Sequence, residues 1–215
     1  MSGGVLALWL GGAYLLGSIS FAAWITRMKS GVDLRSIGSG NLGATNAGRV
    51  LGRGWGLFIY ALDCIKGLVP VGAARWAGDE SVLESFTLPV SVLVGAAAVI
   101  GHCFPVWNRF QGGKGAATTS GVLLTLCPGV AAVGLTVFVL AVAVTRMISV
   151  GSILAGLSLP IAWISIERRH ALDGRGAAVL TFLLLLMTLL LALHRKNMER
   201  IVRGEEPRVG GGKQA

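Results

Sequence analysis

The stretch Gly115–Thr145, GAATTSGVLLTLCPGVAAVGLTVFVLAVAVT, decides how many times this chain can cross a membrane. None of its 31 residues is charged. As a single helix it would be about 46 Å long at 1.5 Å per residue, which is too long for one span unless the helix is steeply tilted. Pro128-Gly129 lies near its middle, and this dipeptide favours a turn. The stretch therefore forms either one long helix or two short ones.

Apolar runs of membrane-spanning length lie on both sides of this stretch. A helix needs about 20 mostly apolar residues to cross a hydrocarbon core of roughly 30 Å. Four runs without Asp, Glu, Lys or Arg approach or exceed that length: Val5–Thr26, Ser85–Asn108, Met147–Ile166 and Gly176–Leu193. Trp55–Ala74 is apolar apart from Asp63 and Lys66, whose three-residue spacing allows an ion pair on one helical face. Because charged residues make up only 13% of the chain, a soluble helical bundle is disfavoured.

The distribution of basic residues decides between the two alternatives. Two helices in Gly115–Thr145 give seven spans, with fourteen basic residues inside and four outside. The inside residues are Arg27, Lys29, Arg35, Arg49, Arg53, Arg109, Lys114, Arg146, Arg195, Lys196, Arg200, Arg203, Arg208 and Lys213, and the outside residues are Arg75, Arg168, Arg169 and Arg175. One helix there would make the count ten against eight. Since cytoplasmic loops carry the excess of Lys and Arg, seven spans fit better.

The expected fold is thus an all-α integral membrane protein with seven transmembrane helices, the amino terminus outside and the carboxyl terminus cytoplasmic. We expect residues 1–206 to form a single seven-helix membrane domain and residues 207–215 a flexible tail. Val5–Thr26 is not a removable signal peptide, because no positive segment precedes it and no polar domain follows. The three cysteines, Cys64, Cys103 and Cys127, form no C-x-x-C pair and are expected to be small buried hydrophobes.

The net charge of +9 could suggest a nucleic-acid partner. However, the basic residues lie between apolar runs, where they would attract anionic lipids or phosphorylated substrates to one membrane face. We therefore expect no nucleic-acid binding.

The seven-span arrangement has a consequence for the segment before the fourth span. Only Gly115–Leu126 precedes the turn, and a dozen residues cover roughly 18 Å as a helix. For this helix to reach the outer face, the preceding glycine-rich segment must enter the protein at membrane depth. Irregular backbone is tolerated there only where it is buried in protein or lines a wet cavity. Gly112–Gly115 is therefore a candidate site.

The first inside loop, Asp33–Arg49, reads DLRSIGSGNLGATNAGR. Its glycines let backbone N–H groups approach an anion. Side-chain donors come from Ser39, Asn41, Thr45 and Asn46, and planar forks of donors from Arg35 and Arg49. An ordinary flexible polar loop is the alternative, but such a loop rarely needs so many glycines and amides.

The second inside loop, Gly101–Gly115, reads GHCFPVWNRFQGGKG and resembles a phosphate-binding P-loop. The P-loop pattern fails twice, because Asn108 stands where the first glycine belongs and Gly115 follows the lysine in place of Ser or Thr. No strand precedes it, so a nucleotide triphosphatase is disfavoured. A glycine-rich loop with Lys114 at the start of a helix is nevertheless suited to bind an anion.

The tail His194–Glu206 reads HRKNMERIVRGEE. His194 and Asn197 are three positions apart and share a helical face, so both can point into one site. The alternative is that the basic run binds anionic lipid headgroups, with Arg200 facing lipid. Glu199 follows His194 by five residues, which places the two side chains about 140° apart on a helix, so they do not form a catalytic pair.

Neither a Ser-His-Asp arrangement nor a His/Cys/Asp metal cluster is visible in the sequence. We therefore expect no metal and no cofactor.

The ordered motifs together resemble the bacterial acyl-phosphate:glycerol-3-phosphate acyltransferase family. The resemblance rests on GSISFA (Gly17–Ala22), DLRSIGSGNLGATN (Asp33–Asn46), LDCIKG (Leu62–Gly67), GHCFPVW (Gly101–Trp107), FQGGKG (Phe110–Gly115), HRKNMER (His194–Arg200) and RGE (Arg203–Glu205). They occur in the family's order from about residue 5 to residue 206. Any one of these motifs would be weak evidence, but their joint occurrence is highly specific.

The resemblance implies transfer of a fatty acyl group from acyl phosphate to glycerol 3-phosphate, giving lysophosphatidic acid for phospholipid biosynthesis. It also implies a seven-helix fold in the bacterial inner membrane, an active site facing the cytoplasm, and membrane lipid as a partner. By the family's pattern Ser39, Arg49 and Lys114 hold the phosphate of glycerol 3-phosphate, and Ser149, His194 and Asn197 complete the site. The expected catalytic residues are Ser39, Arg49, Lys114 and Asn197, the further phosphate-binding residues Gly112, Gly113, Gly115, Ser149 and His194, and the supporting residues Arg35, Asn41, Thr45 and Asn46. The segment around Ser149 matches the family more loosely.

Two rival functions share the same chemistry. A membrane transporter for a phosphorylated anion would use the same donors in broken helices, but the chain has no internal repeat of that kind. The other is a lipid-binding membrane protein without catalysis. For the enzyme, an acyl phosphate is already activated, and the donor's own phosphate could take the hydroxyl proton.

Overall fold

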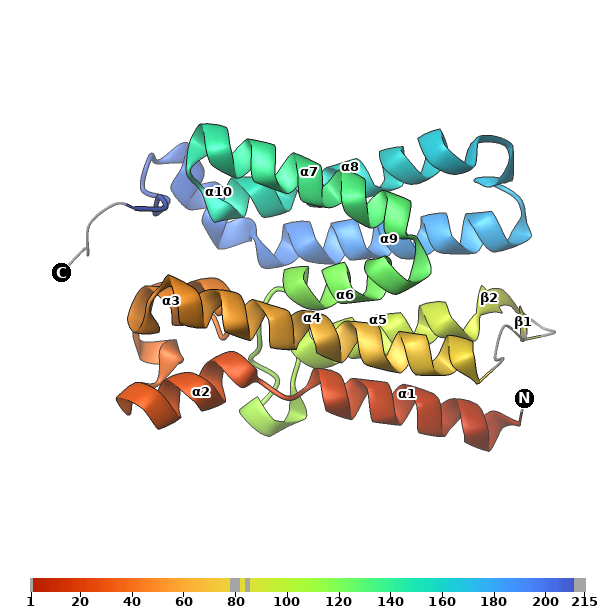
Figure 1. Cartoon of the computed structure of the whole chain (residues 1–215), viewed down its shortest axis with the longest axis horizontal. Coiled ribbons are helices and arrows are strands. Elements are labelled where there is room, and N and C mark those ends of the chain that lie inside the picture. Colours follow the sequence, from red (N-terminus) through yellow and green to blue (C-terminus); the bar gives the residue numbers. More distant parts are fainter. Residues whose placement is uncertain (1, 78–81, 84–85, 211–215) are drawn as a thin grey trace. The chain divides into compact units, whose positions relative to one another are not determined.

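The structure is a computed structural model that describes residues 2–77, 82–83 and 86–210. The described residues are almost entirely helical and fall into two compact units, Met1–Leu126 and Cys127–Ala215 (Figure 1). Among the described residues, six stretches are long and apolar enough to cross a membrane: Gly3–Ser30, Arg53–Trp76, Val90–Asn108, Pro128–Thr145, Ile148–His170 and Gly174–Leu193. The expectation of a helical chain with several apolar spans is confirmed. The predicted tail 207–215 lies outside the described residues from position 211 onward.

The first unit is organised around one long helix. Its elements are α1 (Gly3–Gly17), α2 (Phe21–Ser30), η1 (Leu34–Ser36), α3 (Ala44–Leu51), α4 (Arg53–Trp76), β1 (Val82–Leu83), β2 (Phe86–Pro89), α5 (Val90–Cys103), η2 (Val106–Asn108) and α6 (Ala116–Leu126). β1 and β2 form a short antiparallel pair. α4 contacts each of α1, α2, α3, α5 and α6, and Figure 1 shows it running between α1 and α6. Side chains that α4 buries can therefore act on every part of this unit.

The expected first span is broken into two helices. α1 ends at Gly17 and α2 begins at Phe21, within the charge-free run Val5–Thr26. At the break, the Ser18 N–H and hydroxyl both donate to the Tyr14 carbonyl, each at 2.8 Å. The Ile19 carbonyl instead accepts from the Lys66 ammonium of α4, at 2.6 Å. The break thus depends on a contact between distant parts of the chain, which hydropathy alone does not reveal.

Glycines let α6 lie directly on α4. A side chain at Gly67 would overlap the backbone of Thr118, and one at Gly121 would overlap the carbonyl of Cys64. Small residues at such positions allow helix backbones to approach closely, which is how apolar helices gain packing in a membrane. The short α6 is held along its length by this contact.

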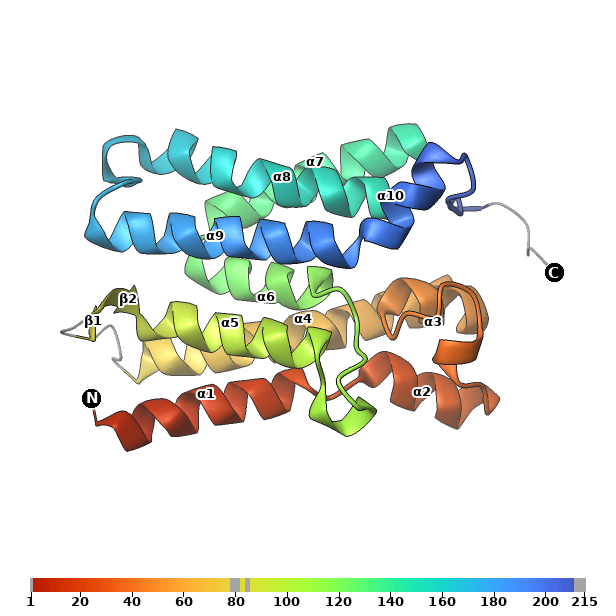
Figure 2. The ribbon, with the colours of Figure 1, turned by 180° about the vertical axis from the view of Figure 1, so that it is seen from behind.

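The second unit consists of α7 (Pro128–Thr145), α8 (Ile148–Glu167), η3 (Arg168–His170), α9 (Gly174–Leu193) and α10 (Arg195–Val202). α8 contacts both α7 and α9, and α10 contacts α9, as Figure 2 shows from the other side. α7 exposes large apolar side chains, including Leu140 (61%) and Val144 (85%), as expected of a face that meets lipid. Pro128 is the first residue of α7, the position where proline is tolerated. The predicted break at Pro128-Gly129 is therefore confirmed.

Candidate functional site

Asn46 organises the first glycine-rich loop. Its side chain is only 2% exposed. The amide nitrogen donates to the carbonyls of Leu34 (3.2 Å) and Ile37 (3.1 Å), and the amide oxygen accepts from the Ser39 N–H at 3.2 Å. A buried amide needs all of these partners, so the loop conformation and Asn46 require one another. Asn46 therefore holds together the loop that carries Ser39.

The turn at Ser39 depends on a glycine before it. Gly38 adopts φ +59, a left-handed conformation that glycine reaches without steric cost. A side chain there would also overlap the Asn46 amide oxygen. Ser39 is exposed at the tip of the turn. Thr45 and Arg49, four positions apart on α3, are exposed on one face of that helix.

Arg35 is engaged within the loop. Its guanidinium Nη2 lies 2.6 Å from a carboxylate oxygen of Asp33. Side-chain hydrogen bonds from Arg35 lower the pKa of Asp33 to about 2, and the same contact raises the pKa of Arg35. Much of the Arg35 guanidinium, whose N–H donors are expected to face a substrate, therefore points towards Asp33.

A small apolar cluster attaches this loop to the helices. Ala22 of α2, Leu34 and Leu42 of the loop, Ala47 of α3 and Ile59 of α4 are all buried together. α3 can approach α4 because Gly48 and Gly56 meet at the crossing, where an added side chain would lie about 3 Å from the opposing Cα. Arg49 follows Gly48 directly and is held by the same crossing.

The second glycine-rich segment folds back along the end of α5. The Phe110 N–H donates to the Pro105 carbonyl at 2.9 Å, and the Gly113 N–H donates to the His102 carbonyl at 3.1 Å. Gly115 has φ +82 and packs against Cys103 and Val99 of α5. α6 begins at the next residue, so its first N–H groups, which lack helical acceptors, follow Lys114 immediately.

This segment lies within the unit, beside the middle of α4. Gly113 is buried against His102, and His102 approaches Asp63 of α4. Asp63 follows Arg53, the first residue of α4, by ten positions, or about 15 Å along a helix. The expectation that the glycine-rich segment enters the protein agrees with this placement. Lys114 is half-buried in the same turn.

In the second unit, predicted site residues gather around a carboxylate that sequence reasoning missed. Glu206 is 5% exposed. One of its oxygens accepts from the Asn197 amide at 2.7 Å and the other from Arg200 Nε at 2.8 Å. Burial raises the pKa of Glu206, but the neighbouring Asn197 amide, Ser149 hydroxyl and Arg200 guanidinium outweigh that effect and leave the pKa below its ordinary value. The buried Ser149 hydroxyl approaches the same carboxylate without a hydrogen bond of ordinary geometry.

The lipid-facing position expected for Arg200 is wrong. Its side chain is 29% exposed and is paired with Glu206. A buried carboxylate requires a cation or several donors, and Arg200 and Asn197 supply both. The structure therefore gives Arg200 a role in shaping the second unit.

His194 lies at the junction of α9 and α10 and is 3% exposed. Its Nδ1 is 2.8 Å from the Leu190 carbonyl. Because a carbonyl only accepts, Nδ1 carries the proton, and Nε2 is the acceptor in the neutral ring. Glu199 is paired with Arg195 at 3.2 Å.

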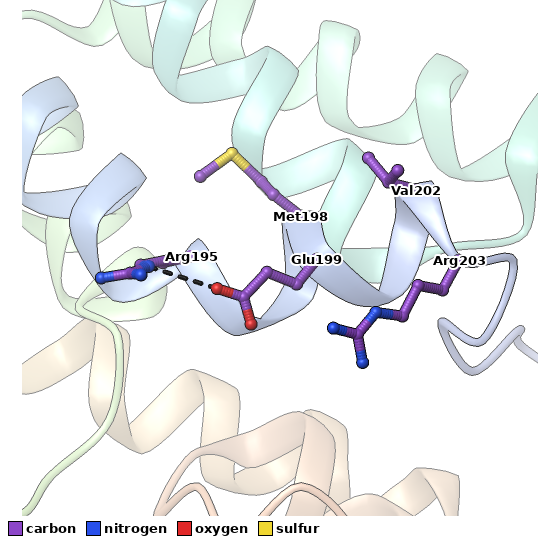
Figure 3. Close-up of a pocket in the computed structure, with 5 residues that line it drawn as sticks. All are labelled: Arg195, Met198, Glu199, Val202 and Arg203. Carbon is purple, nitrogen blue, oxygen red and sulfur yellow. Dashed lines mark hydrogen bonds and ion pairs between the residues drawn. The ribbon is translucent and has the colours of Figure 1, made fainter.

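A shallow hollow on α10 is a separate feature. Figure 3 shows its lining, which consists of Arg195, Met198, Glu199, Val202 and Arg203, with the Arg195–Glu199 ion pair at one side. None of these five is a predicted site residue. The predicted residues His194 and Asn197 are buried, and they do not line this hollow.

Sequence reasoning gave no role to Glu206 or His102. A signal for Glu206 existed, because a carboxylate in a strongly basic tail attracts a cation. His102 stands in a quoted motif, GHCFPVW, but its contact with Gly113 depends on how the chain folds back. The predicted residues form three groups: Ser39, Asn41, Thr45, Asn46 and Arg49 with Arg35; Gly112–Gly115; and Ser149, His194 and Asn197.

Comparisons with known proteins place this arrangement in a family. A family model described as glycerol-3-phosphate acyltransferase matches residues 7–204. The chain is 43% identical to glycerol-3-phosphate acyltransferase of Myxococcus xanthus over 196 residues, covering 91% of this chain and 95% of the relative. It is 40% identical to that of Anaeromyxobacter dehalogenans strain 2CP-1 over 206 residues, covering 94% and 96%.

Two solved structures also match. One is PlsY (YgiH), an integral membrane glycerol 3-phosphate acyltransferase, in its glycerol 3-phosphate form, with a TM-score of 0.82, 35% identity and 96% of both chains covered. The other is the lysophosphatidic acid form, with a TM-score of 0.79, 34% identity and the same coverage. Since these matches cover nearly the whole chain, the chain belongs to the glycerol-3-phosphate acyltransferase family of integral membrane enzymes.

Proposed function

We propose that this enzyme transfers a fatty acyl group from acyl phosphate to glycerol 3-phosphate and releases lysophosphatidic acid and inorganic phosphate. The observation that carries the proposal is the pair of glycine-rich segments in the first unit, each with a cation beside it. One carries Arg49 and Ser39, and the other Lys114 at the start of α6. Family membership supplies the acceptor, and relatives of the same family have been solved with glycerol 3-phosphate and with lysophosphatidic acid.

The reaction requires that the two substrates be positioned and that their negative charges be neutralised. A glycerol hydroxyl oxygen attacks the acyl carbonyl, the bond from that carbonyl to phosphate oxygen breaks, and the departing phosphate takes the hydroxyl proton. Both substrates carry phosphate, so Arg49 and Lys114 offset the repulsion that would keep them apart. Holding the hydroxyl close to the carbonyl supplies the remaining rate enhancement.

Three further predicted site residues belong to the second unit. His194 Nδ1 lies 2.8 Å from the Leu190 carbonyl, and Glu206 accepts a hydrogen bond from the Asn197 amide. We assign Ser149, His194 and Asn197 to completing the phosphate site. Arg35, Asn41, Thr45 and Asn46 support the first loop.

The membrane arrangement we propose has seven spans in one membrane domain, residues 1–206. α6 is the additional span, because α6 and α7 are separate helices on either side of Cys127. The amino terminus lies outside, and the active site faces the cytoplasm at the bacterial inner membrane. Acyl phosphate and membrane lipid are the further partners.

The test is to incubate purified protein in lipid with labelled glycerol 3-phosphate and either acyl phosphate, acyl-CoA or acyl carrier protein. Acyl phosphate should give lysophosphatidic acid and inorganic phosphate in equal amounts, and the thioesters should give neither. The donor assignment fails if acyl-CoA supports comparable turnover. Uptake of glycerol 3-phosphate into sealed vesicles without lysophosphatidic acid formation would instead show a transporter.

A further inference from the structure

Three ionisable side chains are buried together in the first unit, away from any exposed surface. Asp63 is 1% exposed, Lys66 2% and His102 6%. Lys66 Nζ lies 2.7 Å from Asp63 Oδ1, and His102 Nδ1 lies 3.6 Å from the same oxygen. Asp63 and Lys66 belong to α4, and His102 belongs to α5. The predicted ion pair is therefore confirmed, and it has a third member.

His102 carries this network to the second glycine-rich segment. Its carbonyl accepts from the Gly113 N–H at 3.1 Å. Its imidazole occupies the place where a side chain of residue 113 would lie, with Nε2 nearest. The ring is thus held between the Asp63 carboxylate on one edge and the Gly113 backbone on the other. Lys114 is the next residue, so the ring's position determines where the lysine emerges.

Lys66 carries the network to the first glycine-rich loop. Its ammonium donates to the Ile19 carbonyl at 2.6 Å and lies 5.6 Å from the centre of the Phe21 ring. These residues stand at the break from which α2 begins. α2 in turn packs on the loop through the apolar cluster that contains Ala22 and Leu34.

Burial of these charges has to be explained, because a buried ion pair is a poor source of stability. Removing two charges from water costs more than their attraction commonly returns, and apolar residues of similar volume often replace such pairs without loss. A buried polar network does, however, favour one arrangement of the groups it holds, since any other leaves a charge without a partner.

We propose that Asp63, Lys66 and His102 are positioning residues that hold the two glycine-rich segments, and with them Lys114 and Arg49, at the spacing needed to bind glycerol 3-phosphate. This inference rests on the proposed function, because it assigns both segments to one substrate. The network acts through the backbone of Gly113 and through Ile19 and contacts no substrate itself.

Two substitutions of His102 separate positioning from packing. His102→Asn keeps a polar nitrogen near the place of Nδ1 but loses volume, whereas His102→Phe keeps the ring's volume but loses the Nδ1 contact with Asp63. Positioning through Asp63 predicts that His102→Phe raises KM for glycerol 3-phosphate about tenfold and His102→Asn less than about threefold. Packing alone predicts the opposite order. A loss of folded protein would lower apparent kcat and leave KM unchanged.

Asp63→Asn and the double variant complete the test. If both substitutions break the same contact, Asp63→Asn should raise KM as His102→Phe does, and the double variant should be no worse than the more affected single variant. The matched control is Arg75→Met, which removes a hydrogen bond from α4 to the Thr125 carbonyl of α6 but touches neither glycine-rich segment. It should change the melting temperature and leave KM within about twofold.

Glycerol 3-phosphate binding, measured by calorimetry on the same proteins in detergent, distinguishes this inference from the proposed function. Wild-type protein that binds glycerol 3-phosphate without turnover would contradict the proposed function. The order of the variants' affinities for glycerol 3-phosphate would still decide the inference. Three results would overturn the inference. They are a KM that rises more in His102→Asn than in His102→Phe, additive effects on KM in the double variant, and an unchanged KM in folded His102→Phe and Asp63→Asn. Wild-type protein that neither binds nor turns over glycerol 3-phosphate would overturn both.

Discussion

Asn46 and Glu206 play similar parts in the two units of the chain. Each is a buried polar side chain whose polar atoms form hydrogen bonds with neighbouring groups. Each also orients a predicted site residue: Asn46 fixes the backbone at Ser39, and Glu206 fixes the Asn197 amide. Because an unsatisfied buried polar group costs about 1–3 kcal/mol, neither can be replaced without moving what it holds.

Arg49 and Lys114, the two cations proposed to bind phosphate, give the first prediction at this scale. Lys114→Ala and Arg49→Ala should raise KM for glycerol 3-phosphate, and lower kcat if the charge also aligns the two anions. Loss of a charge-assisted contact costs about 1.5–3 kcal/mol, or roughly ten- to a hundred-and-fifty-fold in kcat/KM. Arg169→Ala is the control, because Arg169 is an exposed cation between α8 and α9, and it should change kcat/KM less than about threefold. If Lys114→Ala, Arg49→Ala and Arg169→Ala all have the same kcat/KM, these cations only orient the chain in the membrane.

Glu206 gives a prediction that depends on pH. Glu206→Gln should lower the stability of the folded protein at pH 7 by about 1.5–3 kcal/mol. The glutamine amide has one acceptor oxygen where the carboxylate has two, so either Asn197 or Arg200 loses its acceptor and the other loses a charged one. The pKa of Glu206 is below the ordinary value of 4.5 in the folded protein, so the ionised carboxylate stabilises the fold above that value. This contribution is lost as pH falls through the lowered pKa.

Melting temperatures of wild-type and Glu206→Gln protein measured from pH 7 down to pH 3 should therefore converge at the acid end. Glu205→Gln is the matched control, since Glu205 is exposed, and it should follow wild type throughout. A constant gap between wild type and Glu206→Gln across this range would show that the carboxylate's charge is not what matters.

At the scale of single elements, the short α6 is the feature on which the site depends. It has only 11 residues, and such a helix is marginal without tertiary packing. Its contact with α4 through Gly67 and Gly121 supplies that packing and fixes the end that carries Lys114. Gly113 and Gly115, just before this helix, are buried against α5, and irregular backbone at membrane depth is tolerated where it is buried in protein.

Gly121→Ala should disturb this contact. The added methyl group would overlap the Cys64 carbonyl, so α6 must shift, at a cost of about 1–3 kcal/mol. The apparent melting temperature should fall and KM for glycerol 3-phosphate should rise as Lys114 moves. Gly72→Ala in α4 has open space around the new methyl group and should match wild type in both measurements. Unchanged stability of Gly121→Ala would mean that α6 is not seated through this glycine.

For the whole molecule, we propose that the arrangement of charge around the apolar helices determines the side of the membrane on which the site lies. Fourteen basic residues lie inside in the seven-span arrangement and four outside. Reversing the chain would place the glycine-rich segments, with Arg49 and Lys114, on the outer face. Topology is therefore a functional property of this enzyme.

Reporter fusions test this arrangement. A cytoplasm-active reporter fused after Arg203 should be active, and the same reporter fused after Ala77 should be inactive. The seven-span arrangement puts these two positions on opposite sides of the membrane, and one span more or fewer between them would put both on the same side. A periplasm-active reporter should give the complementary result. Activity on the same side for both fusions would contradict seven spans.

The sequence by itself determined the features that depend on local composition and spacing. Apolar length places the spans, Pro128 separates α6 from α7, and the three-residue spacing of Asp63 and Lys66 predicts their ion pair. Glycine-rich segments with a neighbouring cation predict two anion-binding loops. These properties follow from helix geometry, hydrophobicity and backbone freedom, which neighbouring residues set among themselves.

The tertiary structure alone decided which polar groups find partners far along the chain. Lys66 reaches the Ile19 carbonyl across 47 positions, and that contact accompanies a break in a run that hydropathy would make continuous. His102 contacts Asp63 and Gly113, and Glu206 accepts hydrogen bonds from Asn197 and Arg200. A buried polar group must be paired, but which group pairs with it depends on how the helices pack, and no local pattern encodes that choice.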